Sequence, residues 1–68
     1  MFPNLLGQQA LYRMTDDDMA KIINVSRETY RRKIRNGRFT PSECTAFCIY
    51  FNKRFAYLFS KNDDPLAN

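Results

Sequence analysis

Few side chains in this sequence could carry out chemistry, because histidine is absent and cysteine occurs only at positions 44 and 48. Without histidine, the usual acid–base groups, His-activated nucleophiles and mixed zinc sites lack their parts. Cys44 and Cys48 are spaced i,i+4 and share one face of a helix, where a redox or metal role competes with two small apolar core residues. We favour the core with both thiols reduced, and we expect no enzyme activity and no cofactor.

The run Asp16-Asp17-Asp18 is a second candidate, since paired carboxylates bind hard metal ions. Three successive side chains diverge on a helix, however, and cannot enclose an ion. Aspartates also suit the positively polarised start of a helix. We therefore interpret the run as a helix N-terminus and expect no metal.

Positive charge is concentrated in residues 27–38. Six basic residues and one acid give this segment a net charge of +5, whereas the rest of the chain has five basic and six acidic residues. The basic residues are Arg27, Arg31, Arg32, Lys33, Arg35 and Arg38. This distribution is typical of a contact with a polyanion. The alternative is a solvated face that only keeps the protein soluble.

The composition predicts one small folded domain. A chain of 68 residues buries about 60 % of its unfolded surface, and 44 % apolar residues with ten Phe or Tyr suffice for one core. No apolar run approaches the roughly 20 residues of a membrane span, and the start lacks a signal-peptide pattern. We expect a soluble, cytoplasmic protein.

Three helix starts share one signature, a capping hydroxyl followed by an acidic residue in the first turn. The caps are Thr15, Ser26 and Thr40, and apolar residues flank each of them. Asp18 completes a capping box with Thr15, and Glu43 completes one with Thr40, where a proline also occupies the first helical position. These signals predict the positions at which three consecutive helices begin.

The connections between these helices are short. Asn36-Gly37 suits a left-handed helix end, and Asn24 can take a positive φ between the first two helices. Only Asn24 and Val25 separate the first helix from the Ser26 cap. So short a connection makes two helices cross steeply, as in a helix-turn-helix.

Further helices are predicted on both sides of these three. One covers Asn4 to about Tyr12, the Thr40 helix ends near Asn52, and a short closing helix includes residues 55–59. In the Thr40 helix, an apolar i, i+3, i+4, i+7 stripe faces the core. It consists of Cys44, Phe47, Cys48 and Phe51.

The sequence thus predicts an all-α, compact bundle of four to five short helices that contains a helix-turn-helix. Residues 1–60 form this domain. Residues 61–68 are polar and contain Pro65, so we expect a frayed tail.

An ordered set of residues now supports a resemblance. It consists of Met14-Thr15-Asp16, Met19-Ala20, Asn24-Val25-Ser26, Lys33-Ile34, Asn36-Gly37, Phe39-Thr40 and Leu58-Phe59. In this set the chain resembles the Cro and lambda-repressor-like helix-turn-helix family, especially its small phage and prophage members. The resemblance implies a repressor-type transcriptional regulator in which Ala20 lies where two helices approach closely.

Two departures from the family pattern matter. Asp16 stands where the family often has a Gln that touches a phosphate. The segment from Ser26 to Gly37 is one residue longer than is common, so the register of contacts after Arg31 stays open.

Helical geometry assigns faces to the segment that begins at Ser26. Tyr30 and Ile34 are spaced i,i+4 and point inward with Val25, so the other face is outward. The outward residues are Arg27, Glu28, Arg31, Arg32 and Arg35. A recognition helix places its N-terminal residues on base edges in the major groove.

We therefore predict base contacts by the first four of these outward residues, Arg27, Glu28, Arg31 and Arg32. Arginine can fork onto guanine, and glutamate can accept from cytosine, so G·C pairs are expected in the half-site. Phosphate contacts are predicted for Ser26, Thr29, Lys33, Arg35 and Arg38. Lys33 could equally be an ordinary surface residue.

Apolar side chains remain after the core stripe has been assigned. They are Ala46, Ile49, Tyr50, Phe55, Tyr57 and Phe59. An exposed apolar patch marks an interface, so we expect a homodimer with its recognition helices about 34 Å apart on a near-palindromic operator. Alternatively, the closing helix covers this patch within the monomer.

The sequence predicts a regulator that binds double-stranded DNA, with no membrane and no small-molecule ligand. The alternative is a protein-interaction module of the same fold, such as an antirepressor or an antitoxin, whose basic helix faces an acidic partner. The operator, the target genes, the sign of regulation and the state of the free protein stay open.

Overall fold

The structure, a computed structural model, describes residues 2–61, and this part of the chain is all-α. Its five helices are α1 (Pro3–Leu11), α2 (Asp16–Ile22), α3 (Arg27–Asn36), α4 (Pro41–Phe51) and α5 (Phe55–Leu58). The predicted all-α bundle of short helices is confirmed, and the helix bounds agree with the predicted ones to within about one residue. Residues 62–68 of the predicted tail lie outside the described part of the chain.

The three hydroxyl caps start the helices as predicted. Thr15 Oγ1 accepts from the backbone N–H of Asp18 at 3.1 Å, and the Asp18 carboxylate accepts from the Thr15 N–H at 2.9 Å. Thr40 and Glu43 form the same reciprocal pair at 3.2 and 2.9 Å. Ser26 Oγ accepts from the N–H of Thr29 at 3.2 Å without a returning carboxylate. Each cap satisfies a backbone donor that a helix start leaves free.

Residues in the left-handed conformation follow helices α1, α2, α3 and α4. Asn24 has a φ of 58° after α2, Gly37 has 69° after α3, and Asn52 has 52° after α4. Asparagine and glycine adopt this conformation more readily than other residues. Arg13 is also left-handed, with a φ of 54° after α1, and its residue type does not predict this.

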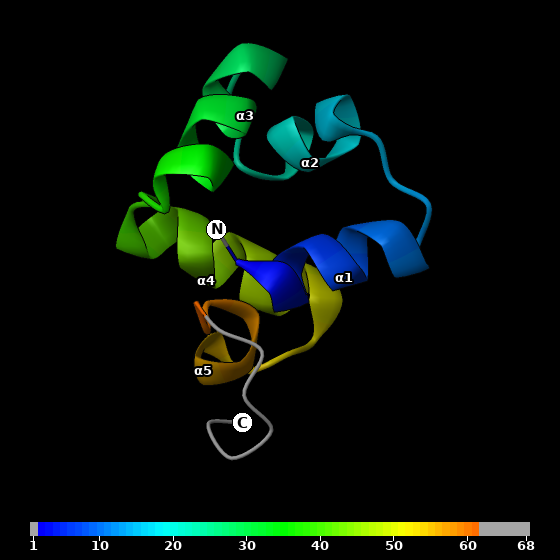
Figure 1. Cartoon of the computed structure of the whole chain (residues 1–68), viewed down its shortest axis with the longest axis vertical. Helices are drawn as coiled ribbons and strands as arrows, with labels where there is room; N and C mark the ends of the chain where they lie inside the picture. Colours follow the sequence, from blue (N-terminus) through cyan, green and yellow to red (C-terminus); the bar gives the residue numbers. More distant parts are fainter. Residues whose placement is uncertain (1, 62–68) are drawn as a thin grey trace.

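Helices α1 and α4 form the middle of the molecule, and the other three helices pack at its two ends (Figure 1). Figure 1 shows α2 and α3 at one end, α5 at the other, and α1 with α4 between them. α2 packs on α3, while α5 packs on both α1 and α4. The largest fully buried side chains, which come from all five helices, are Tyr30, Phe47, Leu5, Met19 and Leu58.

Phe59 is half-buried and packs against the core. The sequence had placed it among the apolar side chains left over for a dimer contact. Its ring lies 5.2 Å from that of Phe2, edge-on, and 5.9 Å from that of Phe39. The reason is that α5 folds back onto α1 and carries Phe59 against the core. Ala46 is likewise half-buried and packs on the core.

Candidate nucleic-acid interface

One face of α3 is lined by charged side chains. Arg27, Glu28, Arg31, Arg32 and Arg35 are all exposed. On the opposite face Tyr30 is 0 % exposed, and Ile34 packs against the core. The division of α3 into an inner and an outer face therefore agrees with the i,i+4 spacing of Tyr30 and Ile34.

The connection between α2 and α3 sets where this charged face begins. The carbonyl oxygen of Ala20 accepts from the backbone N–H of Ile23 at 3.2 Å and from that of Val25 at 3.1 Å. Ala20 itself is 1 % exposed and belongs to the core. A larger side chain at this position would have to displace its neighbours in the core, because packed interiors leave no spare volume.

A chain of polar contacts links α3 to α1 and α2. Tyr30 Oη donates to Gln9 Oε1 at 2.7 Å. Gln9 Nε2 donates to Asp16 Oδ1 at 2.9 Å, and Asp16 Oδ2 lies 3.7 Å from Arg31 Nε. Burial, with the negative charge of Asp16, raises the pKa of Tyr30 well above its usual value, so the phenol stays a donor. No local sequence pattern indicates this role of Gln9, since Tyr30 and Asp16 lie in other helices.

The two hydroxyls at the start of α3 are engaged with each other. Ser26 Oγ donates to Thr29 Oγ1 at 2.9 Å while it accepts from the Thr29 N–H. Ser26 is exposed and Thr29 is half-buried. At the other end of the charged segment, Arg35 and Arg38 are exposed.

Lys33 points toward α4, in contrast to the exposed arginines. Its Nζ lies 3.1 Å from Glu43 Oε1, and the two side chains are only 22 % and 13 % exposed. Burial alone would raise the pKa of Glu43, but hydrogen bonds from Thr40 and Lys33 outweigh it and hold that pKa below its usual value. The ammonium group of Lys33 thus has a protein partner that competes with the predicted phosphate contact.

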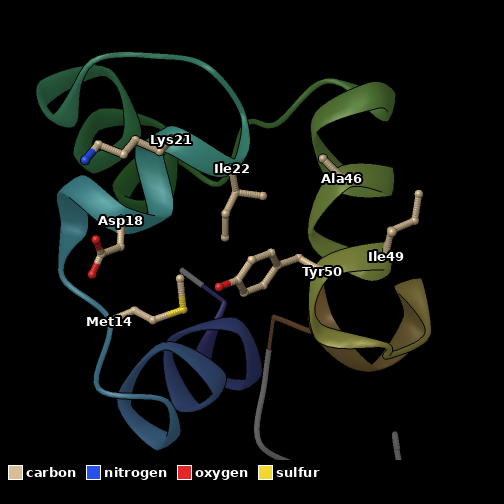
Figure 2. A pocket seen from close by; sticks show the side chains of 7 residues that line it. All are labelled: Met14, Asp18, Lys21, Ile22, Ala46, Ile49 and Tyr50. Carbon is tan, nitrogen blue, oxygen red and sulfur yellow. The ribbon is translucent and has the colours of Figure 1, made fainter.

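Apolar side chains reach the surface on α4 and α5. Ile49 is 75 % exposed, and Tyr50, Phe55 and Tyr57 are exposed as well. A groove of about 610 Å³ lies between α2 and α4, and Figure 2 shows Tyr50 extending from α4 into it. The groove is lined by Met14, Asp18, Lys21, Ile22, Ala46, Ile49 and Tyr50.

The cysteines belong to the core, as predicted. Cys44 is buried and Cys48 is half-buried against the core. Burial raises the pKa of both thiols, which keeps them in the protonated, unreactive form. Asp18 of the aspartate run is held in its capping box, and no group of three potential metal ligands occurs within residues 2–61.

No helix in the described part of the chain is long and apolar enough to cross a membrane. Comparison with known proteins found no matching family model, no matching curated protein and no matching solved structure.

Proposed function

We propose that this chain is a transcriptional regulator that binds double-stranded DNA by inserting α3 into the major groove. The observation that carries the proposal is the outer face of α3, where four arginines and one glutamate are exposed opposite a fully buried Tyr30. A helix about 10–12 Å across fits a major groove about 12 Å wide. The family resemblance supports a Cro- or repressor-type role in a phage or prophage, acting in the cytoplasm.

Base edges are read from the first two turns of α3. Arg27 and Glu28 lie in the first turn, and Arg31 and Arg32 follow in the second. Arginine donates two hydrogen bonds to guanine O6 and N7, and glutamate accepts one from cytosine N4. The binding site therefore contains G·C pairs.

Phosphates are held at the two ends of the charged segment. At its start Ser26 supplies its backbone amide and Thr29 its hydroxyl, because the Ser26 hydroxyl already donates to Thr29. Arg35 and Arg38 supply positive charge near its end. Lys33 is left out of this set because it is paired with Glu43.

A second copy of the chain completes the complex. The exposed apolar residues Ile49, Tyr50, Phe55 and Tyr57 form the contact, since a patch of this kind on a small domain is usually an interface. A two-fold axis there places two α3 helices about one DNA turn, roughly 34 Å, apart on a near-palindromic operator.

Selection from a library of random duplexes by the purified chain tests the proposal. We expect enrichment of one G·C-containing sequence, which Arg27→Ala should weaken and Arg54→Ala should not. Arg54 is the matched control, because it is an exposed arginine outside α3 whose side chain makes no cap hydrogen bond. If the wild-type chain enriches no sequence, a protein-interaction module such as an antirepressor or antitoxin becomes the better reading of the fold.

A further inference from the structure

Arg31 differs from the other arginines on the outer face of α3. Among the described residues, it is the one exposed arginine of this helix with a carboxylate within 4.0 Å. That carboxylate belongs to Asp16, the first residue of α2. The pair therefore connects the outer face of α3 to the neighbouring helix.

Asp16 is itself held in place from the interior. Its Oδ1 accepts from Gln9 Nε2 at 2.9 Å. Gln9 is fixed in turn, because Nε2 also donates to the Met14 carbonyl at 3.2 Å and Oε1 accepts from the buried Tyr30 at 2.7 Å. The carboxylate thus has a defined position, whereas an ordinary surface pair joins two freely moving side chains.

The contact uses the part of the guanidinium that base reading does not need. Asp16 lies near Nε of Arg31, so the two terminal Nη groups can still form the fork that guanine O6 and N7 accept. Binding normally has to immobilise a long arginine side chain, at a cost in conformational entropy. An arginine whose Nε is drawn toward a fixed carboxylate 3.7 Å away has less of that freedom to lose when DNA binds.

We infer that Asp16 is a positioning residue that orients Arg31 to read a guanine, and so sets the base preference at one position of the binding site. The inference rests on the proposed function. It also explains how an acidic residue can stand at the start of α2 beside the proposed DNA-binding face: its two oxygens are directed to Gln9 and Arg31.

The test measures affinity for the selected duplex and for duplexes in which single G·C pairs are replaced by A·T. Arg31→Ala should reduce the preference at one pair by about 5-fold to 150-fold, the usual range for a bidentate base contact. Asp16→Asn keeps an acceptor for Gln9 but loses the charge, and should reduce the same preference by about 2-fold to 5-fold. In the Arg31→Ala background Asp16→Asn should change that preference no further.

Asp17→Asn is the matched control, since Asp17 is exposed in the same helical turn and pairs with Lys21 at 4.0 Å. It should leave the preference unchanged. If Asp16→Asn does not fold, Asp16→Ser takes its place, because serine also suits a helix N-terminus.

Three results would overturn the inference, and they can be told apart. Equal tightening of all duplexes by Asp16→Asn, with the preference intact, would make Asp16 a merely repulsive charge. A change of preference that persists without Arg31 would show that Asp16 acts through another residue. If the wild-type chain selects no sequence at all, the proposed function fails together with this inference.

Discussion

Lys33 of α3 and Glu43 of α4 form a half-buried ion pair, with Nζ and Oε1 3.1 Å apart. Glu43 also accepts from the backbone N–H of Thr40 in the capping box. One carboxylate therefore both caps α4 and fastens it to α3, the helix that carries the charged face. This contact separates the structural role of a basic residue from the role in binding that its position on α3 suggests.

Replacing Lys33 should affect stability more than DNA preference. Lys33→Ala removes a charge-assisted hydrogen bond from a half-buried carboxylate, which costs about 1–3 kcal/mol of unfolding free energy. Urea unfolding gives this value. Lys21→Ala is the control, because its exposed i,i+4 pair with Asp17 contributes about 0.3–0.5 kcal/mol. Equal losses in both variants would contradict the structural role of Lys33.

The same pair makes stability depend on pH. Because the pKa of Glu43 is depressed in the folded state, its contribution is complete above the ordinary value of 4.5 and is lost as pH falls through the lower, folded value. Glu43→Gln should therefore be less stable than the wild type at neutral pH and nearly equal to it in strong acid. Urea unfolding between about pH 2 and 7 would show the two curves converge. Parallel curves would argue against the ion pair.

Replacement of Arg27 and replacement of Arg38 by alanine should weaken DNA binding in different ways. Arg27→Ala should cost about 1–3 kcal/mol at the selected site and relax the preference at one base pair. Arg38→Ala should weaken specific and random duplexes alike and lower the slope of log K against log salt by about 0.9. Titrations at several salt concentrations measure both effects. A uniform loss from Arg27→Ala would remove it from the base contacts.

Ala20 should not tolerate a large side chain. Ala20→Leu overpacks the buried crossing of α2 and α3, at a cost of about 1–3 kcal/mol, and tilts α3. We expect DNA affinity to fall while circular dichroism still shows a folded, helical chain. Wild-type affinity in this variant would mean that the α2–α3 crossing does not position the binding face.

The apolar contact proposed for the second copy can be tested without damage to the core. Ile49→Asn should reduce the complex on a selected operator from two chains to one, as measured by sedimentation with labelled duplex. Leu11→Asn is a fair control, because Leu11 is also exposed but lies outside the proposed contact. A wild-type complex of one chain per site, with a footprint lacking two-fold symmetry, would exclude the dimer.

Sequence reasoning predicted the features of this fold that depend on near neighbours. The caps at Thr15 and Thr40 and the left-handed Asn24 follow from residue types within a few positions of each other. The inner position of Tyr30 follows from helical periodicity in the same way. These signals are local, so a single sequence contains them in full.

The contacts that the sequence did not predict join residues from different helices. Gln9 contacts Asp16 across the α1–α2 connection, and Lys33 contacts Glu43 across the α3–α4 connection. Neither periodicity nor composition reports on such pairs, because they depend on how the helices pack. The half-burial of Phe59 has the same origin, since it depends on where α5 folds back.

Tyr30 also gives this protein a built-in optical probe. The chain has no tryptophan, and of its four tyrosines, all within the described residues, Tyr30 is the fully buried one. Its ring packs in the core, and its hydroxyl donates a hydrogen bond to Gln9 of α1. Near-ultraviolet circular dichroism, which registers immobilised aromatic rings, will therefore report on the packing of α3 in the core, where the ring of Tyr30 lies 6.3 Å from that of Phe47 in α4. The far-ultraviolet signal of the same sample measures helix content. Loss of the core packing around Tyr30 can therefore be detected separately from the unfolding of the helices.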